Sequence, residues 1–111
     1  MNTITLMGRL TREPEFRTTD SGKSVANYTL AVDRIGDKVD FIRCVAWERN
    51  AEFARSYLHK GMKIIAVGSL HINKRNDKEY AEVVVDKTYF CESRKKAEEW
   101  SDMTDDEELP F

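Results

Sequence analysis

The sequence predicts a small all-β domain with one short helix, in which five strands close into a barrel. Three observations support this prediction. Five segments are rich in β-forming residues, one stretch between the third and fourth has helical spacing, and a polar tip joins the last two. A chain of 111 residues, of which 41% are hydrophobic, has room for one compact core.

A proline and a polar turn separate the first two strands. Residues 3–10 ("TITLMGRL") form the first strand. Pro14 follows shortly after, and we expect no regular structure to continue through it. The segment "TTDSGK" has turn chemistry. Residues 24–32 form the second strand, whose apolar face carries Ala26, Tyr28, Leu30 and Val32. Gly36 and Asp37 supply the bend in the next loop.

The third strand, residues 39–47 ("VDFIRCVAW"), has two faces of different character. A period of two places small apolar side chains that suit a core on one face: Ile42, Cys44 and Ala46. The other face interleaves aromatic and basic side chains, and it carries Phe41, Arg43, Val45 and Trp47.

A helix and a hairpin complete the order of elements. We expect the helix over residues 50–61, with Asn50 as its cap and Gly61 at its end. Its core-facing positions are Ala51, Ala54, Tyr57 and Leu58. Strands at 62–70 and 80–90 follow, joined by a tip at Asn76-Asp77. This order matches the oligonucleotide/oligosaccharide-binding (OB) barrel, although a small β-sandwich or a split barrel would give a similar order.

Residues that often carry catalysis or bind metals are isolated in this sequence. Cys44 and Cys91 lack partners at metal-ligand spacing and are expected to be reduced thiols, with Cys44 buried. His59 and His71 are also single. We therefore expect no metal, no cofactor and no enzymatic activity. Because no run of about 20 apolar residues or leader is visible, we expect a cytoplasmic protein without a membrane partner.

A groove for single-stranded nucleic acid needs cations along the phosphates and exposed rings for the bases. The candidate rings are Phe41, Trp47 and Tyr80. The candidate cations are Arg34, Lys38, Arg43, Arg49, Lys74, Arg75 and Lys78. Aromatic residues on strands are more often packing residues, and hairpin lysines are usually only solvated. The coincidence of both sets with the barrel pattern favours a binding surface.

The charge of the chain is divided between two regions. All 18 Lys and Arg residues lie in residues 1–96 together with 13 acidic residues, which gives a net charge of +5. Residues 97–111 carry seven acidic residues and no Lys or Arg, which gives −7. We expect residues 1–93 to form the barrel domain and residues 94–111 to form a disordered, flexible acidic tail. The role of Trp100 in this tail stays open.

Three segments of the chain resemble bacterial single-stranded DNA-binding proteins. They are "ITLMGRLTREPEFRTTDSGKSVANYTLAVDR", "YLHKGMKIIAVGSL" and "EYAEVVVDKTYF". The acidic end with "LPF" is similar to the tip of these proteins. The resemblance implies an OB barrel that assembles as a homotetramer, with a dimer as the alternative. It also implies binding of single-stranded DNA without marked sequence preference, in the cytoplasm at the nucleoid.

The resemblance places the stacking rings of the family at three positions of this chain. Phe41 and Trp47 keep an aromatic residue, whereas Arg75 replaces the usual tryptophan or tyrosine. A guanidinium group also stacks flat on a base. The loop after Ala31 is shorter than in many relatives and lacks their aromatic residue. These two departures predict fewer stacking platforms per subunit. The linker before the tip is also shorter than in many relatives, which keeps the tip near its own barrel.

The end of the sequence, "DDEELPF", is expected to dock on other proteins. The resemblance implies recruitment of replication, recombination and repair proteins. The docking residues are Asp105, Asp106, Glu107, Glu108, Leu109, Pro110 and Phe111. The Phe111 ring fills an apolar pocket, Pro110 stiffens the segment, and the acids meet a basic rim. The alternative is a solubility tail.

Two other functions are compatible with the same residues. An RNA-binding OB barrel shares the rings and the charge but does not need the tip. A primosome or recombination adaptor uses the barrel as a scaffold with weak DNA contact. We also expect the acidic tail to lie on the basic groove when DNA is absent, because +5 and −7 occur on one chain.

Overall fold

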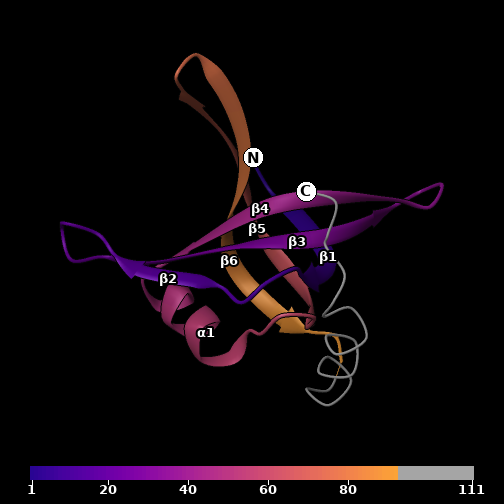
Figure 1. Ribbon diagram of the computed structural model, residues 1–111, viewed down its shortest axis with the longest axis horizontal. Coiled ribbons are helices and arrows are strands. Elements are labelled where there is room, and N and C mark those ends of the chain that lie inside the picture. Colours follow the sequence, from indigo (N-terminus) through magenta and orange to yellow (C-terminus); the bar gives the residue numbers. More distant parts are fainter. Residues whose placement is uncertain (93–111) are drawn as a thin grey trace.

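The computed structural model describes residues 1–92, and the expected acidic tail at 94–111 lies outside the described residues. The described part contains six strands and one helix (Figure 1). They are β1 (Ile4–Leu10), β2 (Glu15–Thr18), β3 (Ser24–Arg34), β4 (Lys38–Trp47), α1 (Arg49–Tyr57), β5 (Lys63–Arg75) and β6 (Lys78–Phe90). Among these residues, no helix is long and apolar enough to cross a bilayer.

Five of the strands close into a barrel, which confirms the predicted fold class. The strands follow the order β1-β5-β6-β4-β3, and β3 pairs back to β1 through Arg9 opposite Ala31 and Leu10 opposite Leu30. The junction between β4 and β6 is parallel and short, with two residue pairs. The short strand β2 adds to the free edge of β3. The OB topology therefore holds, with one additional edge strand.

The core lies inside the barrel and beneath α1. Its buried residues come from every barrel strand and include Leu10, Ala26, Tyr28, Leu30, Cys44, Ala46, Ile64, Ala66, Val83 and Val85. Small side chains on α1, Ala51 and Ala54, are fully buried together with Leu58. Because alanine side chains are small, the backbone of α1 can approach the sheet closely, and α1 packs against β3 and β4 at one end of the barrel.

The two long hairpins turn where the sequence predicts. Gly36 and Asp37 have positive φ angles of 90° and 60° at the tip between β3 and β4. Asn76 and Asp77 have φ angles of 53° and 63° at the tip between β5 and β6. Only Asn76 and Asp77 separate the paired residues Arg75 and Lys78, so their positive φ angles fit the type I′ turn that matches the twist of antiparallel strands. The loop between Arg34 and Lys38 is one residue longer. The hairpin of β5 and β6 extends away from the barrel (Figure 1).

Four local predictions about the elements were wrong: the absence of an element after Pro14, the Asn50 cap, the helix end at Gly61 and the burial of Tyr57. The strand β2 follows Pro14 directly, where no regular element was expected. Asn50 does not cap the helix: α1 begins at Arg49, and the Asn50 side-chain amide instead donates to the Val85 carbonyl at 3.2 Å. The helix ends at Tyr57, whose ring is 57% exposed rather than packed on the core.

Candidate nucleic-acid interface

The outer face of β4 carries the aromatic and basic residues that the alternation predicts. Cys44 and Ala46 are buried on the inner face of the strand. On the outer face, Trp47 is 39% exposed, Arg43 is exposed, and Phe41 is half-buried. Val45 is the exception, because it is buried although it shares the face of Trp47. Neither predicted stacking ring is enclosed by the core.

Two hollows lie beside this row. The larger has a volume of about 580 Å³, and Met7, Val32, Val39 and Phe41 give it apolar walls. The smaller has a volume of about 340 Å³ and is polar, with Arg12, Asn27, Thr29, Arg43 and Glu82 in its lining. Both hollows lie along the outer faces of β3 and β4, and Thr11 contributes to the lining of each.

Cations lie along the β3–β4 hairpin and at its two ends. Arg34 and Lys38 are opposite each other at the outer end of the ladder. The Arg34 guanidinium approaches the Asp40 carboxylate at 3.7 Å, but both side chains are about half exposed, so the pair is weak. Arg49 is exposed at the other end, in the first turn of α1. The row of Phe41, Arg43 and Trp47 therefore lies between two basic ends.

The β5–β6 hairpin divides its predicted residues between two faces. The register pairs Arg75 with Lys78 and Asn73 with Tyr80, so these side chains share one face. The parallel pairs Cys44–Val83 and Val45–Val84 put this face on the same side of the sheet as Phe41 and Trp47. Lys74 points to the opposite face. Within this hairpin, Arg75 and Lys78 therefore share a face with Tyr80, and Lys74 does not.

Met7 and Val39 are candidate site residues that were missed. Both are about half exposed and line the larger hollow beside Phe41. Val39 lies two residues before Phe41 on the same strand, and Met7 lies between the outward positions Thr5 and Arg9. A period of two would have found both as apolar residues on a polar face.

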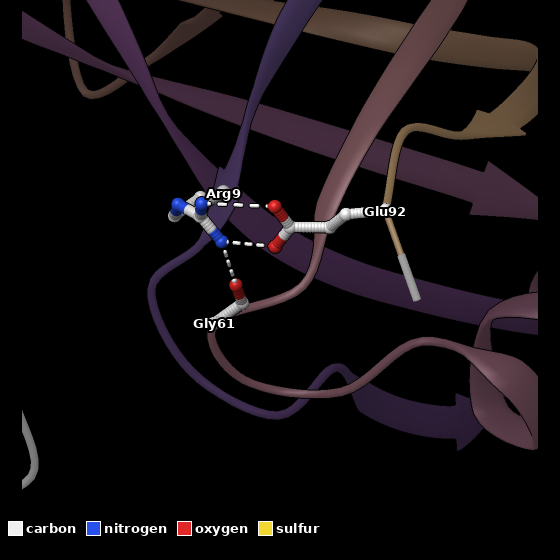
Figure 2. Close-up of polar contacts among 3 residues, drawn as sticks. All are labelled: Arg9, Gly61 and Glu92. Carbon is white, nitrogen blue, oxygen red and sulfur yellow. Dashed lines mark hydrogen bonds and ion pairs between the residues drawn. The ribbon is translucent and has the colours of Figure 1, made fainter. Parts of the chain in front are cut away.

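An ion pair fixes the wall of the larger hollow. The Arg9 guanidinium binds the Glu92 carboxylate through both terminal nitrogens and donates to the Gly61 carbonyl at 2.8 Å (Figure 2). The two side chains are only 20% and 11% exposed. An ion pair that is mostly buried and fully hydrogen-bonded keeps both side chains in one geometry. The cluster ties the end of β1 to the turn before β5 and to Glu92, two residues after the end of β6.

The buried titratable groups do not suggest catalysis. Burial raises the pKa of the Cys44 thiol to about 12, so it stays protonated, and the prediction of a buried Cys44 thiol is confirmed. Burial, with the nearby Cys44, also raises the pKa of Tyr28. Within residues 1–92, no group of three His, Cys, Asp or Glu residues is placed to hold a metal ion.

The closed barrel with this exposed aromatic and basic face defines a binding module of the OB class. The chain belongs to the single-strand binding protein family, whose model matches residues 1–91. This assignment confirms the resemblance seen in the sequence.

Individual relatives agree with the family assignment. The chain is 38% identical to the "Single-stranded DNA-binding protein 2" of Listeria innocua, over 88% of this chain and 69% of the relative. It is 37% identical to the "Single-stranded DNA-binding protein" of Thermotoga maritima, over 98% of this chain and 86% of the relative. Both are named as binding proteins and not as enzymes, in agreement with the prediction of no enzymatic activity.

A solved structure supports the fold. The chain is similar to a deletion mutant of the single-stranded DNA binding protein from Thermus aquaticus, with a TM-score of 0.73 and 29% identity. The match covers 84% of this chain but 42% of the Thermus chain. The chain likewise spans 63% of a Staphylococcus aureus relative.

Proposed function

We propose that this protein binds single-stranded DNA without marked sequence preference and protects it in the cytoplasm. The observation that carries the proposal is the outer face of β4, where Trp47 is 39% exposed and Arg43 lies between Trp47 and Phe41. Aromatic rings accept any base because every base has a flat π-face. Family membership supports the same function.

The path of the strand follows the two hollows beside β4. Bases lie in the apolar hollow at Phe41 and on the ring of Trp47, whereas phosphates face Arg43 and the cations at the ends of the hairpin. Tyr80, Arg75 and Lys78 on the β5–β6 hairpin lie on the same side of the sheet and extend this surface. Lys74 is outside the path because it belongs to the other face.

Titration of tryptophan emission with oligo-dT tests the proposal. Stacking on Trp47 should quench its emission, and a Trp100→Phe background removes the signal of the second tryptophan. Saturable quenching with poly-dT, stronger than with poly-U, supports a DNA-binding function. Stronger binding of poly-U would favour the RNA-binding alternative, and no quenching by either polymer would contradict the proposal.

We further propose that the segment Asp105–Phe111 recruits replication, recombination and repair proteins. This segment lies outside the described residues, and its sequence supports the proposal: four acids precede a leucine, a proline and a phenylalanine. Calorimetry with a replication or repair enzyme that acts on single strands should show binding by the chain and weaker binding by Phe111→Ala. Equal binding by both would contradict this role.

We also propose self-association, as a homotetramer or a dimer. Two features support it. The strand β1 pairs with β5 along one edge, but along its other edge it pairs with β3 only at Arg9 and Leu10. On that second edge, residues Ile4 to Gly8 have no strand partner among the described residues. Leu70 and Ile72 are exposed on one face of the extended β5–β6 hairpin. Sedimentation equilibrium measures the mass, and a monomer at micromolar concentration would contradict the proposal.

A further inference from the structure

A third hollow lies between the start of α1 and the end of β6, and the proposed DNA path does not include it. Its volume is about 280 Å³. Its lining consists of two aromatic rings, two cations and two polar side chains: Phe53, Tyr89, Arg49, Lys87, Asn50 and Thr88. None of these six residues is acidic. This composition combines flat rings, positive charge and hydrogen-bonding groups in one place.

The hollow exists because β4 leaves the sheet before β6 ends. The two strands pair only at Cys44–Val83 and Val45–Val84. Beyond Trp47 the chain turns at Glu48, where φ is 55°, and continues into α1. Among the described residues, the end of β6 therefore has a strand partner only on the β5 side.

The rings of this hollow are positioned to receive a flat ligand. Phe53 is held between Tyr57 and Phe90, with ring centroids 5.1 Å and 5.7 Å away. Tyr89 also lines the hollow and is 51% exposed. Tyr89 and Phe90 are neighbours on β6, so their side chains lie on opposite faces of the strand, and the Tyr89 ring stays outside the packed group of Phe53 and Phe90. Tyr89 is therefore the ring of this hollow on which an aromatic group can stack.

The cations of this hollow face outward without an acidic partner. Arg49 and Lys87 are exposed, and neither makes an ion pair with another residue among those described. The nearest acids of the helix start are engaged elsewhere. Glu48 accepts the Ser24 backbone N–H at 3.2 Å, and Glu52 accepts the Arg55 guanidinium at 3.0 Å. The hollow therefore presents net positive charge to a ligand.

We infer that this hollow is a nucleobase subsite that extends the DNA path beyond Trp47, with Tyr89 as the stacking ring. Arg49 and Lys87 face the adjoining phosphates, and the Thr88 hydroxyl offers a hydrogen bond to the base edge. The inference rests on the proposed function. It is supported by continuity, because Arg49 follows Trp47 by two residues and both border the same end of β4. A strand that passes Trp47 meets the hollow next.

A length series of oligo-dT tests the subsite. Oligonucleotides of about 4 to 16 nucleotides cover the range of sites on single OB barrels. Tyr89→Ala should leave the affinity for the shortest binders unchanged and lower the affinity for longer ones by about fivefold or more, as expected for one lost stacking contact. Tyr89→Phe keeps the ring and should bind like the unmodified protein.

Crosslinking gives a second, independent measurement. Oligo-dT with 5-iodouracil at one end, irradiated in complex with the full chain, should attach to Tyr89 and not to Tyr57. Sedimentation and thermal melting of Tyr89→Ala should match the unmodified protein.

Any result for Tyr89→Ala other than a loss of affinity confined to the longer oligonucleotides would overturn the subsite. Unchanged affinity of Tyr89→Ala at all lengths would do so while leaving the proposed function intact. An equal loss at all lengths, or a change in oligomeric mass, would also overturn it, because Tyr89 would then act through the main surface or through assembly. Absence of oligo-dT binding by the unmodified protein would instead remove the proposed function, and the subsite with it.

Discussion

At the scale of single residues, the two proposed stacking rings, Trp47 and Phe41, differ in exposure. Trp47 is 39% exposed at the end of β4, whereas Phe41 is half-buried in the wall of the apolar hollow. An exposed ring contributes to binding without contributing much to stability. A substitution at Trp47 should therefore change the affinity for DNA with less effect on the stability of the fold than a substitution at Phe41.

Trp47→Ala is expected to weaken binding of oligo-dT by about 1–3 kcal/mol, which is about five- to 150-fold, because one stacking platform is lost. Trp47→Phe should keep most of the affinity. Fluorescence anisotropy of labelled dT measures both, and thermal melting should show a similar stability for the two variants. An unchanged affinity of Trp47→Ala would favour the adaptor function, in which DNA contact is weak.

Tyr28 carries a hydroxyl group in the core that makes no hydrogen bond of normal geometry within the described residues, although Thr88 lies near it. Because an unpaired buried hydroxyl is costly, Tyr28→Phe is expected to raise the free energy of unfolding by up to about 1 kcal/mol. Urea denaturation measures the change. A loss of stability in both Tyr28→Phe and Thr88→Val would show instead that the two hydroxyls are bonded.

At the scale of elements, the β5–β6 hairpin separates cations that are neighbours in the sequence. Arg75 shares the face of Lys78 and Tyr80, whereas Lys74 shares the face of Ile72. Arg75→Ala should therefore reduce the slope of log affinity against log salt by about 0.7 for one lost phosphate contact. Lys74→Ala should leave the slope unchanged. Equal slopes for both variants would contradict the proposed path along this hairpin.

A bulge bends the same hairpin out of the barrel at a glycine. The register of β5 and β6 shifts between Val67 and Gly68. A Cβ atom at Gly68 would lie 1.9 Å from the Val84 carbonyl oxygen, which is backbone and has little freedom to move. Gly68→Ala is expected to cost about 2 kcal/mol or more of stability. Urea denaturation measures it, with Ser69→Ala as the neighbouring control that should change stability by less than about 0.5 kcal/mol.

The sequence predicts these elements well where the local pattern has a single physical cause. Alternation on β4 identifies the outer face because one side of that strand is core. Positive φ angles at Asn76 and Asp77 follow from the preference of these residues for such turns. The strand β2 has no such local signal: its four residues are ordered by pairing with β3, which is a tertiary contact.

The site was predictable in part for the same reason. Phe41, Arg43 and Trp47 lie on one strand, so a period of two finds them. The split between Arg75 and Lys74 depends on the register of two strands, and the hollow at Tyr89 depends on where β4 leaves the sheet. Tyr57 was misplaced because helical spacing cannot show that the core ends before the helix does.

At the scale of the whole molecule, the charge distribution predicts that the acidic tail competes with DNA. Residues 102–111 hold five of the seven acids of the tail, while the region that contains the barrel has a net charge of +5. A tethered anionic segment acts at a high effective concentration and competes with DNA phosphates for the same cations. We therefore expect the complete chain to bind DNA more weakly than a chain without this segment when salt does not screen the attraction.

Deletion of residues 102–111 is expected to increase the affinity for oligo-dT severalfold at about 0.01 M salt, where screening extends over about 30 Å, and to have little effect near 1 M, where it extends over about 3 Å. A variant that replaces Asp105, Asp106, Glu107 and Glu108 by their amides keeps the length and should behave like the deletion. If the amide variant binds like the unmodified chain while the deletion binds more tightly, the segment acts by occupying space and not by charge. If neither variant changes the affinity at low salt, the tail does not contact the groove at all.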